Sequence, residues 1–188
     1  YNGGNFENII GGQDVKTDVS AWLFNVGAEA KVGPVGLFGE FTYATGDDNP
    51  DDTDFDGYMP LVGNGRGWSE IMGEGDLDIQ ASANSPGTRI TNIWYVGGGA
   101  DYNLTEKLKL TGSVWYANLI EKAQIDRPDE NLGFEIDGKI SYTLIENLKL
   151  DLYGAVLFAG DGTYKEDYDD AGKAEDPYEL GLRLQMSF

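Results

Sequence analysis

Residues 132–160 read LGFEIDGKISYTLIENLKLDLYGAVLFAG, and this stretch determines the fold that the sequence predicts. Over residues 132–144, and again over residues 148–160, apolar side chains alternate with polar ones. Alternation of this length is typical of a β-strand that has one apolar and one polar face. Ile145, Glu146 and Asn147, which separate the two runs, leave room only for a tight turn. The stretch therefore predicts a long β-hairpin.

Five further stretches repeat the alternation, so the sequence predicts seven strands in all. They comprise residues 18–32, 35–45, 90–104, 107–118 and 178–188. In the first of them, Trp22, Phe24 and Val26 fall on one face, and Asn25 and Glu29 fall on the other. The predicted strands run to roughly 11–15 residues, whereas globular strands cluster near 5–6 and a tilted membrane-spanning strand needs about 9–11. This length favours strands that cross a membrane.

The connections between the strands alternate in length. Tight turns are predicted at Gly33–Pro34, at Thr105–Glu106 and at residues 145–147, and long polar loops are predicted over residues 46–89, 119–131 and 161–177. Short turns at one end and long loops at the other are typical of outer-membrane barrels, as are aromatic residues near the strand ends. We therefore expect an all-β fold, an antiparallel transmembrane β-barrel whose apolar face contacts lipid. The alternative is a soluble antiparallel barrel or sandwich whose apolar face points inward.

Residues 1–188 are expected to form one transmembrane β-barrel segment with no separate domain. Seven is an odd number of strands, whereas bacterial single-chain barrels usually have an even number. Counting back through the turns from residue 188 places residues 1–16 at the long-loop end, as a loop. A strand edge that faces lipid leaves backbone N–H and C=O groups without partners. We therefore expect at least one further strand to pair with residues 18–32, as part of a larger barrel.

The composition excludes several function classes. The chain has no His and no Cys, so the usual catalytic dyads and triads cannot form, and we do not expect an enzyme. The formal net charge of −20 argues against nucleic acid as a partner, because phosphate contacts need Lys and Arg. Two of the long loops carry −14 of this charge, with ten acids against one base in residues 46–88 and seven against two in residues 161–176. These loops are expected either to attract cations to a pore mouth or to be a solvated surface that meets lipopolysaccharide through divalent ions.

The end of the chain resembles the closing strand of bacterial outer-membrane proteins. It reads Tyr178-Glu-Leu-Gly-Leu-Arg-Leu-Gln-Met-Ser-Phe188, and such strands usually end in a Phe that the outer-membrane assembly machinery recognises. The resemblance makes Phe188 the expected assembly signal. The acidic stretch over residues 46–57, followed by Tyr58-Met-Pro-Leu61, is similar to a loop of alginate-export-type porins. The chain thus resembles the C-terminal portion of a porin of this family, which implies a channel in the bacterial outer membrane.

Polar residues on the second face of the strands are the candidates to line a pore. They are Glu29, Glu40, Glu135, Asp137, Lys139, Asp151, Glu179 and Arg183. On this face acids slightly outnumber bases, whereas the alginate exporter has a markedly basic lumen. These residues therefore argue against alginate, and the expected cargo is a small hydrophilic solute, with a preference for cations that comes from the acidic loops.

One motif in the first long loop has the spacing of a metal site. Asp52, Asp54 and Asp56 precede Gly57 in the order D-x-D-x-D-G, which is the start of a calcium-binding loop. The bidentate Glu of the twelfth position is missing, because Gly63 stands there. A Ca²⁺ site and an acidic solvated loop both remain open, and no other cofactor is expected.

Two functions are compatible with these patterns. The first is a porin-like channel for the passive diffusion of small hydrophilic solutes, with a long loop folded inward as its constriction. The second is a structural or scaffold barrel that sheaths or anchors a partner protein without conducting solutes. Conductance across a planar bilayer distinguishes them.

Overall fold

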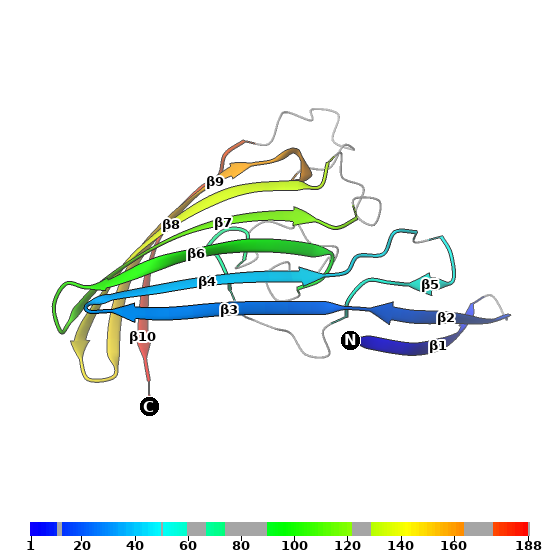
Figure 1. Cartoon of the computed structure of the whole chain (residues 1–188), viewed down its shortest axis with the longest axis horizontal. Coiled ribbons are helices and arrows are strands. Elements are labelled where there is room, and N and C mark those ends of the chain that lie inside the picture. Colours follow the sequence, from blue (N-terminus) through cyan, green and yellow to red (C-terminus); the bar gives the residue numbers. More distant parts are fainter. Residues whose placement is uncertain are drawn as a thin grey trace.

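The computed structural model describes residues 1–10, 13–49, 51–59, 67–73, 90–121, 129–163 and 175–187. Its main element is one antiparallel sheet of seven strands (Figure 1). In chain order these are β3 (Leu23–Val32), β4 (Val35–Ala44), β6 (Ile93–Asn103), β7 (Leu108–Leu119), β8 (Asn131–Ile145), β9 (Leu148–Ala159) and β10 (Tyr178–Met186). The seven strands that the alternation predicts are thereby confirmed as one all-β, antiparallel arrangement.

Each strand of this sheet pairs with the next one along the chain, from β3 to β10. Tight turns join β3 to β4 and β8 to β9, and in them Gly33 and Asn147 have positive φ angles of 60° and 65°. Within the described residues β3 and β10 are the two edges and do not pair with each other, so the sheet is open and no closed barrel is formed. In the part of the chain that the structure describes, no helix is long and apolar enough to cross a membrane.

The N-terminal residues differ from the prediction. Residues 1–16 were expected to be a loop, but they form most of a hairpin of β1 (Asn2–Ile10) and β2 (Gln13–Ala21), which projects beyond the long-loop end of the sheet (Figure 1). The expected strand over residues 18–32 is interrupted at Trp22, where β2 ends and β3 begins. A short strand, β5 (Asp54–Phe55), pairs in parallel with β2. Asn2 and Asn5 are on opposite faces of β1, so polar residues on both faces conceal this strand from a search for alternation.

The outer face of the sheet carries the apolar side chains and is exposed. On the edge strand β10, Leu180, Leu182 and Leu184 are 76%, 67% and 63% exposed. Even on the central strands β7 and β8, Val114 and Ile136 are each 45% exposed. Nothing in the described chain packs over this face, which is the reverse of a soluble sheet with an apolar core.

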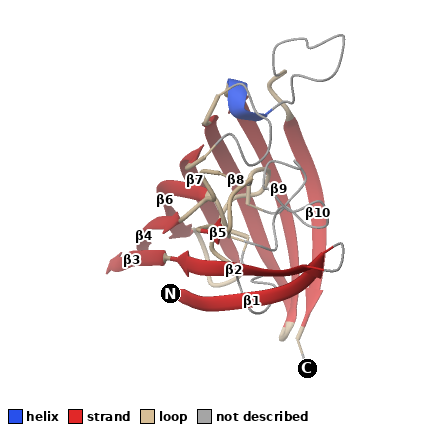
Figure 2. Ribbon diagram, turned by 90° about the vertical axis from the view of Figure 1, so that its right-hand side faces the viewer, coloured by secondary structure: helices blue, strands red, loops and turns tan. Residues whose placement is uncertain are grey.

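The inner, concave face carries the buried core at its long-loop end (Figure 2). Tyr95, Trp115 and Leu157 point inward there and are at most 5% exposed. Small residues make room for the large rings, since a Cβ at Gly97 would overlap the indole of Trp115. The core is completed by Trp68, Ile71 and Met72, which come from the long loop between β4 and β6.

Candidate functional site

The register of the sheet places all eight predicted pore-lining residues on the inner face, because paired residues of neighbouring strands point to the same side. One row crosses all seven strands and consists of Glu29, Phe38, Gly99, Ser113, Asp137, Ala155 and Glu179. A second row, nearer the long loops, consists of Glu40, Gly97, Trp115, Glu135 and Leu157. Towards the short turns, Lys139 is paired with Tyr153, and Asp151 is paired with Arg183.

Residues 67–73 lie across this face and are referred to below as the inner segment. The ring of Trp68 stacks on Tyr95 of β6, with centroids 4.1 Å apart and planes 5° from parallel. The same ring meets Trp115 of β7 edge to face, at 5.6 Å. Such aromatic pairs contribute about 0.5–1.5 kcal/mol beyond the burial of their surfaces. The first part of the inner segment is therefore fixed on β6 and β7.

Glu135 of β8 holds the middle of the inner segment. Its Oε1 accepts a hydrogen bond from the backbone N–H of Ile71 at 2.7 Å, and its Oε2 accepts one from Met72 at 2.8 Å. The carboxylate is fully buried. Hydrogen bonds to a charged group each contribute about 1.5–3 kcal/mol, and a buried carboxylate without them is costly. Glu135 is thus on the predicted face, but it contacts the inner segment and not open space.

A third attachment reaches the edge strand β10. Glu70 Oε2 lies 3.8 Å from Arg183 Nη2, and the guanidinium of Arg183 lies 4.9 Å from the centre of the Tyr153 ring. The inner segment therefore contacts strands from β6 to β10, and it covers the inner face at the level of the second row.

Glu40, on β4, is the centre of a separate group of hydrogen bonds. Its Oε1 accepts from the hydroxyl of Tyr95 at 2.8 Å and from Asn25 Nδ2 at 2.9 Å. Asn25 Nδ2 also donates to Thr42 Oγ1 at 2.7 Å. These bonds orient Tyr95, and with it the platform on which Trp68 stacks.

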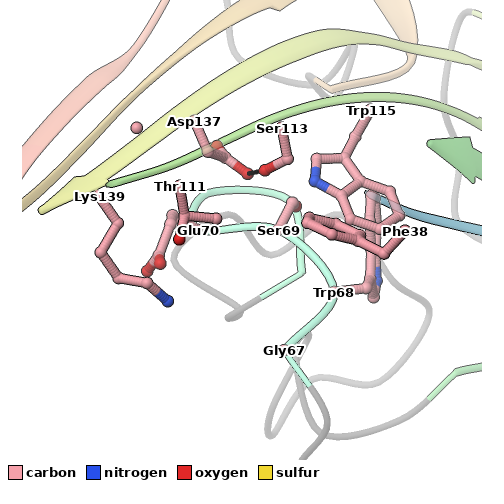
Figure 3. A pocket seen from close by; sticks show the side chains of 11 residues that line it. Phe38, Gly67, Trp68, Ser69, Glu70, Thr111, Ser113, Trp115, Asp137 and Lys139 are labelled. Carbon is pink, nitrogen blue, oxygen red and sulfur yellow. Dashed lines mark hydrogen bonds between the residues drawn. The ribbon is translucent and has the colours of Figure 1, made fainter. Parts of the chain in front are cut away.

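A pocket of about 150 Å³ opens between the inner segment and strands β7 and β8 (Figure 3). Its aromatic lining comes from Phe38, Trp68 and Trp115. Its polar lining comes from Ser69, Glu70, Thr111, Ser113, Asp137 and Lys139.

The inner face is hollow towards the short turns. A second space, of about 580 Å³, is bounded there by polar residues, among them Lys107, Lys109, Lys139 and Lys149. Lys109 forms an ion pair with Asp101 at 3.3 Å. Glu29, which is exposed, borders an adjoining space beside Lys31.

The acidic loop after β4 has its own hydrogen bonds. Asp52 Oδ1 accepts from the N–H of Asp54 at 2.8 Å, and Asp52 Oδ2 accepts from Asn49 at 3.1 Å. Burial raises the pKa of the Asp47 carboxyl, although hydrogen bonds from the backbone of Asp56 and Asn49 act in the opposite direction. Among the described residues, no three acidic side chains are gathered as a metal site. Calcium binding by Asp52, Asp54 and Asp56 stays a prediction.

Two further predictions fall partly or wholly outside the described residues. Phe188, the expected assembly signal, is not described, and most of the loops over residues 46–89 and 161–177 also lie outside the described ranges. The sequence predicts the inner face and an inward-folded long loop, but it does not identify residues 67–73 as the part of the loop that lies there. The available signal was Trp115, a large aromatic residue at a position where the alternation expects a polar one.

No protein-family model and no curated protein sequence matches the chain.

Proposed function

We propose that the chain forms part of the wall of a bacterial outer-membrane channel for the passive diffusion of small hydrophilic solutes. The observation that carries the proposal is the outer face of the sheet, which is apolar and exposed on all seven strands, while the charged residues of the strands lie on the inner face beside a core confined to the long-loop end. Soluble monomers rarely expose apolar patches larger than a few hundred Å². The exposed apolar side chains here extend over all seven strands, from Phe24 on β3 to Met186 on β10.

In a bilayer, lipid chains cover the outer face, and the inner face borders water. The edges of β3 and β10 then need partner strands, because backbone groups in hydrocarbon require hydrogen bonds. The lipid bilayer, lipopolysaccharide at the long-loop surface and the outer-membrane assembly machinery are accordingly the proposed partners. The proposal does not depend on the likeness to alginate-export-type porins.

Within this channel the inner segment is the constriction. It is attached to the wall at three places, by the rings of Tyr95 and Trp115, by Glu135 and by Arg183. A solute that passes along the inner face has to go around it. The acidic long loops on one side of the constriction favour cations over anions.

The lipid contact is tested by placing a single tryptophan on either face. Trp94 lies on the outer face of β6, beside Phe41 and Tyr116, and Trp115 lies on the inner face of β7. One full-length variant keeps only Trp94 and a second keeps only Trp115, with Phe at the other Trp positions. In vesicles with bromine-labelled lipid tails, we expect strong quenching of Trp94 and little quenching of Trp115. Equal quenching of the two would contradict the proposed orientation.

The transport function is tested by conductance. Full-length protein in a planar bilayer is expected to give stepwise currents in KCl. Lipid quenching of Trp94 without any conductance would favour the alternative, a scaffold barrel that sheaths or anchors a partner protein.

A further inference from the structure

The pocket between the inner segment and strands β7 and β8 combines two kinds of surface. Phe38, Trp68 and Trp115 supply aromatic surface, and hydroxyl, carboxylate and ammonium groups supply the rest. The three rings come from three different elements, β4, the inner segment and β7, so the pocket exists only because the inner segment lies on the sheet (Figure 3).

A buried donor in this pocket lacks a partner. Trp115 is 5% exposed, and its Nε1 has no hydrogen-bond partner within the described chain. Figure 3 shows this nitrogen on the side of the indole that is turned towards Ser113 and Asp137. A buried N–H without an acceptor is destabilising, so such a group in a folded protein requires an explanation.

One carboxyl oxygen of Asp137, an acceptor in the same pocket, also lacks a partner among the described residues. Asp137 Oδ2 accepts from the hydroxyl of Ser113 at 3.1 Å, whereas the buried Oδ1 has no hydrogen-bond partner in the described residues. The neighbouring Glu135 is an acceptor that is already bonded to Ile71 and Met72. A ligand hydroxyl satisfies both groups, because it accepts from an N–H and donates to a carboxylate.

The surroundings select the class of ligand. Asp137, Glu70 and Lys139 line the pocket, and Arg183 lies 3.8 Å from Glu70, so two acids face two bases and this balance favours a neutral ligand. The C–H faces of a pyranose ring carry a slight positive charge, and they pack well on the negative faces of aromatic rings. A cavity of about 150 Å³ holds a ring of the size of benzene, and because this pocket is open to the inner face, the outer hydroxyl groups of a pyranose extend out of it.

We propose that this pocket binds one neutral pyranose unit, whose hydroxyl accepts a hydrogen bond from Trp115 Nε1 and donates one to Asp137. The inference rests on the proposed channel, because the pocket is then a subsite at its constriction. With this subsite, the channel prefers neutral saccharides to other small hydrophilic solutes.

The test is calorimetric titration of the full-length protein in detergent with glucose, glucuronate and glucosamine. Trp115→Phe keeps an aromatic ring and removes the N–H, and Trp94→Phe on the outer face is its matched control. We expect glucose to bind, Trp115→Phe to weaken binding about three- to tenfold, the worth of one hydrogen bond, and Trp94→Phe to leave it unchanged. If Trp115→Phe does not fold, Asp137→Asn tests the other half of the site and is also expected to weaken binding.

Several outcomes would overturn the inference. They are no heat with glucose, equal affinity in wild type and Trp115→Phe, or tighter binding of glucuronate or glucosamine than of glucose. Bilayer conductance shows whether the saccharide site or the channel itself is wrong. Stepwise currents in a protein that does not bind glucose would overturn the saccharide site alone, whereas glucose binding without currents would overturn the channel alone.

Discussion

The two halves of the inner face are built from the same strands but differ in what fills them. Near the long loops, Tyr95, Trp115 and Leu157 form a buried core with the inner segment. Near the short turns, the same strands present Lys109 and Lys149 to a space of about 580 Å³. The two halves belong to the same antiparallel sheet, but the inward side chains of the filled half are large and apolar, whereas those of the hollow half are polar. In the channel that we propose, the constriction therefore lies where the wall carries aromatic residues and the wide part where it carries lysines.

The largest expected effect comes from releasing the inner segment, which removes the difference between the two halves. In Glu135→Ala, the N–H groups of Ile71 and Met72 lose their acceptor, at about 1.5–3 kcal/mol for each bond. We expect higher single-channel conductance and faster amide hydrogen exchange at these two residues. Glu29→Ala is the control, since Glu29 is on the same face but is exposed. Unchanged conductance in Glu135→Ala would mean that the inner segment does not constrict the path.

The second prediction concerns the packing that makes the filled half possible. A side chain at Gly97 would overlap both the Trp115 ring and the carbonyl oxygen of Val114. Gly97→Val is therefore expected to lower the free energy of unfolding by about 1–3 kcal/mol, as overpacking does. Urea unfolding of the protein in lipid vesicles measures this. Gly112→Ala on the outer face is the control, because a Cβ there is 3.8 Å from its nearest neighbour. Equal losses in both variants would argue against a specific role for Gly97.

The seven strands of the sheet could be predicted from the sequence, because apolar and polar side chains alternate along them. This alternation identifies both the strand and its two faces. The pore-lining candidates followed from the same alternation. An inward-folded long loop was expected, but its residues could not be identified, because the contacts of residues 67–73 reach positions more than 20 residues away, as in the hydrogen bond between Ile71 and Glu135. The β1–β2 hairpin was missed for another reason. In β1, polar residues fall on both faces, so this strand has no regular alternation, and only the second half of β2 falls within the first predicted strand, residues 18–32.

The third prediction uses charge to compare the two ends. At one end, the described parts of the two acidic loops outside the inner segment carry nine acids and no base, whereas the space at the other end is bordered by four lysines and three acids. In a KCl gradient at low salt, reversal potentials are expected to show a preference for K⁺. The preference should decline towards 1 M salt, because the Debye length falls from about 30 Å at 0.01 M to about 3 Å at 1 M. It should also be stronger when the dilute solution faces the long loops. Anion selectivity at low salt would show that the lysines, and not the loops, control permeation.

The smallest expected effect is the ordering of the acidic loop by calcium. Six Asp residues occur between residues 47 and 56, and they repel one another unless a cation neutralises them. Calorimetric titration with Ca²⁺ is expected to give heat in the wild type and little in the double variant Asp54→Asn/Asp56→Asn. The raised pKa of Asp47 adds a pH dependence, because a carboxyl must lose its proton to bind a metal. Affinity should therefore fall as the pH is lowered towards that raised pKa, and Asp47→Asn should reduce the dependence. Equal heats in the wild type and the double variant would show that the D-x-D-x-D-G motif is an acidic loop without a calcium site. The two ends would then differ in the charge of their side chains and not in bound metal.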